Sequence, residues 1–371
     1  MPIRGDRLQK PSYAILRSLR GGNVGEAWLA QHEVFGQRVV QKTYSVVGLE
    51  DSVACREPRL LRNISHDHVA RVYEAQWDPD YTRAITFVMP FYEGGSIADA
   101  FDEGYQFSIH RSIKLTEHVL DALAHVHTTH RYVHRDTKPG NIFLDATREN
   151  AYLGDFGSAA ELDATGRVPA IEGSPLYMPP EGGPQTGTMG VQGDIYGMGI
   201  TLYELLNGPF PYADISPEEV ERRLARGRRA LPDRMFDGWQ PWIPDDLRSA
   251  VRKAIRHDPG DRYQSCSEFI RRLQRIRCID WGRVSGDDLD GEWVGTWPPH
   301  DREDRRRVYR VESRVLRGSK RRLTAVESRP GASPRRFGVE DATLADPTDV
   351  AGVARFFADV AARAHHRAPA H

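Results

Sequence analysis

Cysteine is scarce in this chain of 371 residues, and its three cysteines, Cys55, Cys266 and Cys278, share no metal-ligand spacing. This scarcity excludes a disulfide framework and predicts free thiols in a reducing compartment. The sequence also has no run of about 18 apolar residues, so no transmembrane helix is predicted. No apolar stretch follows the first residues, which argues against a signal peptide. We therefore expect a cytoplasmic globular protein.

An excess of charge of either sign is also missing. Lys and Arg together number 51 and Asp and Glu 52, so the net charge is −1. This balance argues against a globally basic nucleic-acid binder and against an acidic disordered tail protein. Lysine is rare, with 6 Lys against 45 Arg, a bias typical of a GC-rich genome.

The hydrophobic pattern changes along the chain and predicts an α+β protein with two lobes. Residues 1–12 lack periodicity and are expected to be a lead-in. Between residues 13 and 92, one helical pattern interrupts β-rich stretches, which are at Leu16, 27–29, 38–40, 69–73 and 84–89. From residue 93 to 275 helical periods dominate, and the predicted helices are 113–127, 195–206, 217–224, 247–255 and 267–276.

The remaining segment, 276–371, is expected to be a small α+β accessory module that binds a protein partner. Residues 308–316 alternate like a strand that pairs with 323–327, and 349–364 has the pattern of an amphipathic helix. Three tryptophans are interpreted as a mini-core rather than a stacking platform: Trp281, Trp293 and Trp297. Residues 302–336 hold 13 basic and 4 acidic residues. We favour a solvated strand face there over a grip on nucleic acid or another anion.

The most specific motif is HRDTKPGN at residues 134–141, followed by Asp155-Phe156-Gly157. With this spacing the chain resembles the eukaryotic-type (Hanks-type) Ser/Thr protein kinases, and its Arg-rich composition suggests a bacterial member. The resemblance implies a kinase domain over 13–275, with a β-rich N-lobe (about 13–92), a helical C-lobe (about 93–275) and a cleft between them.

The resemblance also assigns roles in phosphoryl transfer, which depends mainly on positioning and on neutralising phosphate charge. Asp136 would accept the proton of the incoming hydroxyl, and Lys138 would lie near the moving phosphate and favour Ser/Thr substrates. Asn141 and Asp155 would hold Mg²⁺, which prefers oxygen ligands. ATP and Mg²⁺ are the implied cofactors.

Residues upstream match the family's phosphate site. Gly22 and Gly25 fall in its glycine-rich hairpin, although Arg20 replaces the first glycine of the pattern. Glycine there lets backbone N–H groups approach the phosphates. Lys42 would hold the α- and β-phosphates, and Glu57 would be its helical partner.

Pro58 departs from the family pattern, because proline is costly inside a helix but tolerated in the first turn. The helix that carries Glu57 is therefore expected to begin near Cys55 or Arg56.

The implied adenine site is the hinge after the last β-rich stretch. Met89 would be the gatekeeper, and the Pro90 carbonyl and the Tyr92 backbone would pair with adenine. Three side chains would enclose the ring: Ala27, Val40 and Phe143.

Two further matches are interpreted as structural. Glu181, in a block that shapes the peptide-binding surface of protein kinases, should pair with Arg262. Asp194 and Gly199 fit the buried helix that supports the catalytic loop.

Regulation by phosphorylation is less clear from the sequence. Arg135 would grip an activation-loop phosphate, but the usual phosphosite is Ala170 here. The remaining candidates are Ser158, Thr165 and Ser174, and Glu161 or Glu172 could supply the charge directly. We expect activation to need no phosphate at the usual site.

The resemblance implies an ATP- and Mg²⁺-dependent protein Ser/Thr kinase that also autophosphorylates. Protein substrates are its expected partners, and nucleic acid is not expected. The alternatives are a pseudokinase scaffold, favoured only by Arg20 and Pro58, and a small-molecule phosphotransferase, which shares an HxD-type loop. A metal site is not predicted from the histidines, because no Cys or carboxylate cluster completes one: His66, His68, His125, His127 and His130.

Overall fold

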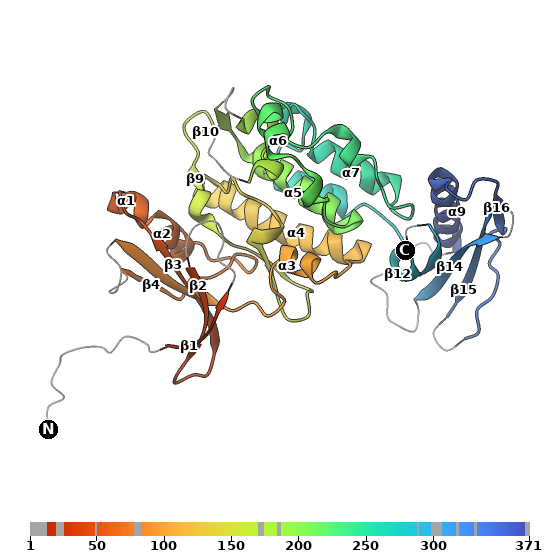
Figure 1. Cartoon of the computed structure of the whole chain (residues 1–371), viewed down its shortest axis with the longest axis horizontal. Helices are drawn as coiled ribbons and strands as arrows, with labels where there is room; N and C mark the ends of the chain where they lie inside the picture. The colour runs from red at the N-terminus through yellow and green to blue at the C-terminus, as the bar shows by residue number, and fades with distance from the viewer. Residues whose placement is uncertain are drawn as a thin grey trace.

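The computed structural model describes residues 13–19, 26–48, 50–77, 83–169, 174–183, 187–287, 289–297, 306–316, 319–329 and 332–367. The predicted lead-in and the hairpin residues Arg20, Gly22 and Gly25 lie outside these ranges. A β-rich N-lobe, a helical C-lobe and a unit of one sheet and one helix follow one another along the chain (Figure 1).

The N-lobe is an antiparallel sheet in the order β1-β2-β3-β5-β4. Its strands are β1 (Tyr13–Leu19), β2 (Glu26–His32), β3 (Arg38–Ser45), β4 (Glu74–Trp77) and β5 (Ala84–Pro90). Helices α1 (Asp51–Ala54) and α2 (Arg56–Asn63) connect β3 to β4. Because α2 begins at Arg56, Pro58 lies in its first turn, which confirms the predicted start of this helix.

The predicted strand at 69–73 is wrong. This segment lies where the lobes meet, and it bonds to the C-lobe: Val69 forms an isolated bridge with Leu153, and the Ala70 N–H donates to the Leu153 carbonyl over 2.8 Å. The β pattern therefore marked real backbone bonds, but in the described structure only the Tyr73 N–H reaches the sheet, where it donates to the Val88 carbonyl of β5 over 2.8 Å, and β4 begins only at Glu74.

The C-lobe is built on helices at each position where the sequence predicts one, and it also has the helix Ile97–Asp102, which was not predicted from the sequence. They are α3 (Ile97–Asp102), α4 (Ile109–His125), α5 (Val191–Asn207), α6 (Pro217–Leu224), α7 (Asp245–Ala254) and α8 (Cys266–Leu273). Helix α5 is buried almost throughout because it lies between α4 and α7. Short strand pairs carry the loops of the cleft: β6 (Tyr132–Val133) with β9 (Ala160–Glu161), β7 (Ile142–Leu144) with β8 (Ala151–Leu153), and β10 (Val168–Pro169) with β11 (Thr188–Met189).

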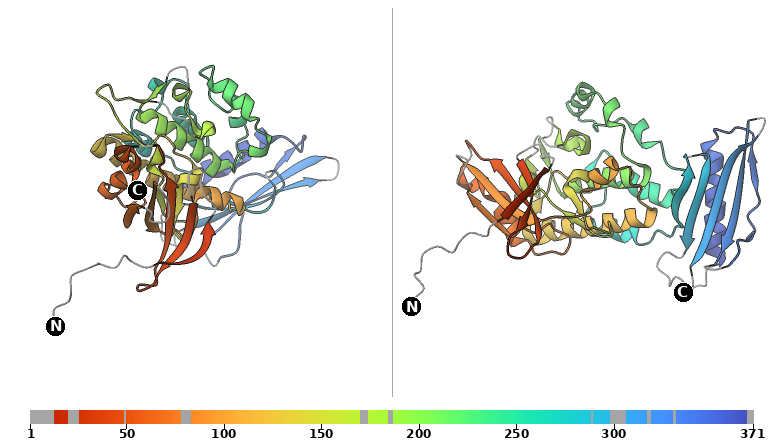
Figure 2. Two further views of the ribbon diagram at one scale, coloured as in Figure 1. Left: turned by 60° about the vertical axis from the view of Figure 1, so that its left-hand side comes forward. Right: turned by 60° about the horizontal axis from the view of Figure 1, so that its bottom comes forward.

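The last unit is a five-stranded antiparallel meander with α9 (Val350–Arg367) along one face (Figure 2). Its strands are β12 (Asp280–Gly286), β13 (Gly291–Trp297), β14 (Arg307–Leu316), β15 (Lys320–Ser328) and β16 (Ala342–Leu344). The predicted β14–β15 pairing and terminal helix are confirmed, and the tryptophans of β12 and β13 are buried as a core.

This unit shares its core with the C-lobe. The rings of Trp242 and Trp293 lie 5.5 Å apart, and Trp242 also contacts Phe357 of α9. At the start of α4, the Asp280 carboxylate accepts hydrogen bonds from the Ser108 hydroxyl and the His110 N–H. Among the described helices, none combines the length and the apolar character that crossing a membrane requires.

Candidate active site

The loop with the HRDTKPGN motif, residues 134–141, follows β6, and its backbone is held by Asp194 of α5. The Asp194 carboxylate, 1% exposed, accepts hydrogen bonds of 2.8 Å from the backbone N–H groups of His134 and Arg135 and from the His127 ring. Burial raises the pKa of Asp194, but the hydrogen bond and charge of His127 outweigh it and hold this pKa below its usual value. Asp194 therefore remains ionised and fixes the backbone on either side of Arg135.

Asp136 lies at the centre of a set of hydrogen bonds. Its Oδ2 accepts from Lys138 Nζ over 2.7 Å and from Asn141 Nδ2 over 2.9 Å. Its Oδ1 accepts from the Ser174 N–H over 3.3 Å, and Lys138 also bonds to the Ser174 hydroxyl. The carboxylate is thus held in a fixed orientation beside an ammonium group, an arrangement that suits a proton acceptor.

Asp155 lies just after β8, on the same lobe as Asp136, and faces Lys42 of the N-lobe. Lys42 Nζ on β3 lies 3.3 Å from Asp155 Oδ1. Burial raises the pKa of Asp155, but the charges of Lys42 and His134 outweigh it, so this pKa is lowered. The Gly154 N–H donates to the Asn141 carbonyl over 2.9 Å, which ties Asp155 to the loop of Asp136.

Glu57 does not form the predicted ion pair with Lys42. Its side chain is 8% exposed, and its Oε1 has no hydrogen-bond partner. Burial raises the pKa of Glu57 to about 7, although the charge of Lys42 and a hydrogen bond from the Phe156 backbone lower it. Lys42 pairs with Asp155 instead, so the α2 carboxylate faces the backbone after Asp155.

An apolar cluster lies between the lobes where the sequence predicts the adenine ring. Phe87 and Met89 of β5 are buried, with Val40 and Phe143 packed against this group. The rings of Tyr92 and Phe143 stack 5.4 Å apart, nearly parallel. Pro90 pairs with Val39 at the end of β5, and Ala27 pairs with Lys42 across β2 and β3.

Several residues of the site were not predicted from the sequence. A Cβ on Gly154 would lie 2.4 Å from the Phe143 ring, so only glycine leaves this ring in place. His127 was expected to be merely solvated or packed, yet it bonds Asp194. Gly154 could have been noticed in the sequence because it directly precedes Asp-Phe-Gly, whereas nothing in the sequence indicates that His127 bonds Asp194.

The oxygens available in the cleft fit Mg²⁺. The hydrogen bonds of the Asn141 side chain use its Nδ2, which leaves Oδ1 as a ligand, and the lowered pKa of Asp155 keeps its carboxylate charged. One amide and one carboxylate oxygen are the donors this ion prefers when phosphate supplies others. In the described ranges, no group of three or more His, Cys, Asp or Glu side chains is arranged to hold a metal ion.

The activation segment is held by two arginines. Arg135 donates to the Ser158 carbonyl over 2.5 Å and to the Pro169 carbonyl over 2.7 Å. No ion pair joins Arg135 to Glu161 among the described residues, and Ala170 and Glu172 lie outside them. Arg262, 1% exposed, forms the predicted pair with Glu181 through two bonds of 2.7 Å.

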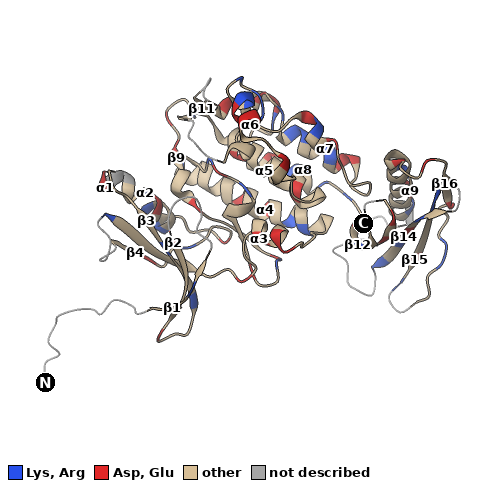
Figure 3. Ribbon diagram, in the orientation of Figure 1, with Lys and Arg blue, Asp and Glu red and all other residues tan. Residues whose placement is uncertain are grey.

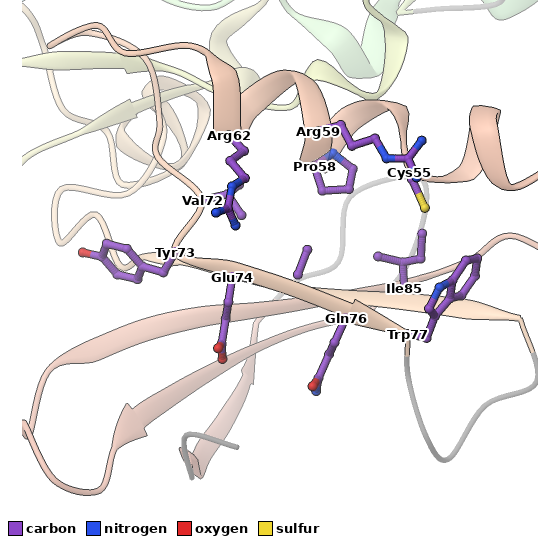
Figure 4. Close-up of a pocket in the computed structure, with 11 residues that line it drawn as sticks. Cys55, Pro58, Arg59, Arg62, Val72, Tyr73, Glu74, Gln76, Trp77 and Ile85 are labelled. Carbon is purple, nitrogen blue, oxygen red and sulfur yellow. The ribbon is translucent and has the colours of Figure 1, made fainter. Parts of the chain in front are cut away.

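A hollow of about 230 Å³ lies between α2 and strands β4 and β5 (Figure 4). Pro58 and Arg59 line it from the helix, and Trp77 and Ile85 line it from the sheet. None of the predicted site residues lines this hollow. Helix α2 also contacts α1 and the turn Phe156–Ser158, and its Leu60 and Leu61 belong to the apolar core that continues through the C-lobe.

Comparison with known proteins gives a consistent picture. The family model described as a protein kinase domain matches residues 13–272. The chain is 26% identical over 263 residues to the serine/threonine-protein kinase PrkC of Bacillus subtilis, a match that covers 69% of this chain and 39% of PrkC. It is 32% identical over 263 residues to the serine/threonine-protein kinase sid1 of Schizosaccharomyces pombe (67% and 54%).

A further relative is the serine/threonine-protein kinase pkn2 of Myxococcus xanthus. The identity is 29% over 275 residues, which covers 70% of this chain and 32% of that protein. The chain thus spans between about a third and a half of the length of these three curated relatives.

Proposed function

Since the chain belongs to the protein kinase domain family, we propose that it transfers the γ-phosphate of ATP to Ser or Thr hydroxyls of protein substrates in a reaction that needs Mg²⁺. The observation that carries the proposal is the convergence of Lys42, Asp136, Lys138, Asn141 and Asp155 in one cleft.

In the proposed reaction, the substrate hydroxyl oxygen attacks the γ-phosphorus while the bond between this phosphorus and the β–γ bridging oxygen breaks, and ADP leaves. Asp136 accepts the hydroxyl proton, and Lys138 neutralises charge on the phosphoryl oxygens. Asp155 and Asn141 would hold Mg²⁺, which neutralises phosphate charge when bound. Lys42 binds the α- and β-phosphates, and its charge is secure because the carboxylates of Asp155 and Glu57 outweigh burial and raise its pKa.

The remaining nucleotide contacts follow from the apolar cluster. Ala27, Val40 and Phe143 enclose adenine, Met89 closes the back of the site, and the backbone of Pro90 and Tyr92 binds the ring edge. Gly22 and Gly25 cover the phosphates. Glu57 is the acidic partner of Lys42 once nucleotide draws the lysine away from Asp155.

The test is Asp136→Asn, with Asp163→Asn in an exposed turn as the matched control. With radiolabelled ATP and a generic basic protein, Asp136→Asn should reduce labelling by about 10²- to 10⁴-fold, because the proton acceptor is lost. The control should label normally, and calorimetry should detect nucleotide binding by both variants. Labelling that survives in Asp136→Asn would contradict the proposed role, and absence of labelling in the parent protein would favour a pseudokinase.

We also propose that activation needs no phosphate at the usual site, because Arg135 bonds carbonyls at both ends of the segment. Autophosphorylation would occur at Thr165, in an exposed turn, or at Ser158, whereas Ser174 already contacts Lys138. Mass spectrometry and phosphatase treatment test this. Activity abolished by the phosphatase would refute it.

Residues 13–275 are proposed to be the kinase domain, which acts in the cytoplasm because its cysteines are free thiols. Residues 276–371 are proposed to bind a protein partner and to direct the kinase. A truncation after Arg275 also needs Trp242→Gln, because removal of Trp293 exposes Trp242. This shortened chain should phosphorylate a generic protein but lose selectivity. If it fails to fold, the module is a structural support.

A further inference from the structure

A strongly charged groove lies between α7 and α8 of the C-lobe and is lined by none of the predicted site residues. Figure 3 shows where Lys and Arg lie along the ribbon of the C-lobe. The helices run antiparallel, joined by the ion pairs Lys253–Glu268 and Arg272–Asp246, each 2.8 Å. The groove has a volume of about 530 Å³. Six cations line it, and we call this set the basic groove: Arg252, Lys253, Arg256, Arg271, Arg272 and Arg275.

Four of these cations have no carboxylate to neutralise them. Lys253 and Arg272 pair with the acids named above, whereas the guanidinium groups of four exposed arginines form no ion pair within the described part of the chain: Arg252, Arg256, Arg271 and Arg275. The basic groove therefore keeps a concentrated positive charge, although the protein as a whole is nearly neutral.

The helix ends do not explain this charge. A helix C-terminus favours cations, but it contributes only about half a negative charge. Two such ends, together with Glu268 and Asp246, balance about three of the six cations. In addition, Arg256 and Arg275 lie just beyond the ends of α7 and α8, so four unpaired guanidinium groups of the same sign line one groove, where like charges repel each other. An arrangement that costs stability and is not needed by the helices points to a ligand.

We propose that the basic groove docks a short segment, rich in Asp and Glu, of a protein substrate. Helices of ten and eight residues are about 12–15 Å long, the span of four or five residues of an extended peptide. The only aromatic ring lining the basic groove is that of Tyr263, which is buried under the Lys253 ammonium at 4.4 Å. Nucleic acid bases therefore find no stacking surface there, which favours carboxylates of a peptide.

The docking of a substrate rests on the proposed function. Helices α7 and α8 contribute none of the groups around Asp136, so docking would act by holding the acceptor segment near the cleft and raising its effective concentration. It should therefore lower the KM of a substrate that carries an acidic segment and leave kcat unchanged.

Binding is tested first, without catalysis, on the full chain. The probes are fluorescein-labelled octaglutamate and octaglutamine, followed by fluorescence anisotropy in 50 mM NaCl. The groove variant combines Arg252→Gln, Arg256→Gln, Arg271→Gln and Arg275→Gln. The control variant removes the same charge from exposed arginines of the last unit: Arg310→Gln, Arg314→Gln, Arg336→Gln and Arg355→Gln.

Octaglutamate should bind at least about tenfold more tightly than octaglutamine, lose about tenfold in the groove variant, keep its affinity in the control, and weaken in 200 mM NaCl. Equal binding of the two peptides, or an equal loss in the control variant, would overturn the proposal. So would tighter binding of an eight-nucleotide single-stranded DNA or of phosphatidylserine vesicles that the groove variant abolishes. Circular dichroism verifies that both variants fold.

A kinetic comparison then addresses the substrate. An acceptor peptide is joined through a flexible linker to eight glutamates or to eight glutamines. The parent protein should show about a tenfold lower KM for the glutamate form, and the groove variant should show no difference, with kcat equal throughout. If the parent protein transfers no phosphate, the proposed function fails while the anisotropy result still decides the docking. A KM that does not depend on the glutamates would overturn substrate docking.

Discussion

The two lobes that meet at Lys42 and Asp155 are packed very differently. In the C-lobe one apolar core extends through α4, α5, α7 and α8 and continues into the last sheet. In the N-lobe sheet the buried apolar side chains form small separate clusters, and Val34 and Phe35 are about four-fifths exposed, at 81% and 78%. The catalytic loop thus rests on a rigid support, while the sheet over the nucleotide is held by few contacts and is expected to open more easily.

The buried charges differ in the same way. In the C-lobe, Arg262 and Asp194 have their hydrogen-bonding positions filled by Glu181, His127 and backbone groups. In the N-lobe, Glu57 keeps a buried oxygen without a partner. The charges of the C-lobe therefore maintain its structure, whereas one oxygen of the Glu57 carboxylate remains without a hydrogen-bond partner among the described residues, as the proposed change of partner on nucleotide binding requires.

The largest expected effect is on the buried pair of the C-lobe. Arg262→Met leaves Glu181 as a buried charge without its cation, so the free energy of unfolding should fall by about 3–5 kcal/mol in urea denaturation. The matched control is Arg222→Met, which removes an exposed pair with Glu219 and should cost less than about 1 kcal/mol. A similar loss in the free energy of unfolding for the two variants would mean that the buried pair Arg262–Glu181 stabilises the C-lobe no more than an exposed pair does.

The variant Asp194→Asn tests whether helix α5 also positions the loop that carries Asp136. An amide cannot accept from all three donors, so the free energy of unfolding should fall by about 3 kcal/mol. The kcat should fall with it, while nucleotide affinity is retained, because the loop of Asp136 loses its support. The lowered pKa of Asp194 also predicts that the parent protein loses this stability as the pH falls through that pKa, a loss the variant should lack. An unchanged kcat would contradict a positioning role.

Glu57→Gln should have the opposite effect on stability. The Glu57 pKa of about 7 lies above its unfolded value, so the parent protein should lose stability as the pH rises from about 4.5 to about 7. The glutamine variant avoids this loss. Its free energy of unfolding relative to the parent should rise by about 2 kcal/mol between pH 5 and pH 8. If the free energies of unfolding of the two proteins changed in parallel with pH, the raised pKa of Glu57 would be contradicted.

The smallest effect is expected at the border of the lobes, where the ring of His118 on α4 stacks on His68, 3.8 Å away. Burial, assisted by the charges of His68 and Lys114, lowers the pKa of His118 to about 4. The unfolded chain therefore takes up the proton first, and stability is lost as the pH falls from about 6.5 to 4. After allowance for partial exposure, His118→Gln should reduce this loss by about 1 kcal/mol. If the free energy of unfolding of both proteins fell equally between pH 6.5 and pH 4, the proposed contribution of His118 to this loss would be wrong.

Much of the fold was predictable because local patterns and final contacts agree. Helix α6 has the predicted bounds, since its apolar face and its Ser216 cap are encoded within ten residues. The segment at 69–73 misled for the opposite reason, because its bonding partner, Leu153, is some eighty residues away. Within the site, the spacing of the residues from Asp136 to Asp155 indicated which side chains matter. The partner of Lys42 and the role of His127 could not be predicted, because they depend on the placement of α2 and α5.

The amino-acid sequence by itself determined the order of β-rich and helical regions and the set of charged groups that the cleft would contain, since both are written in short-range periodicity and spacing. Only the tertiary structure decided that Lys42 bonds Asp155 rather than Glu57, and that four arginines in and just after α7 and α8 line one groove without an ion pair among the described residues. Those outcomes are set by distances between segments remote in the chain, where a shift of a few ångströms makes or breaks an ion pair.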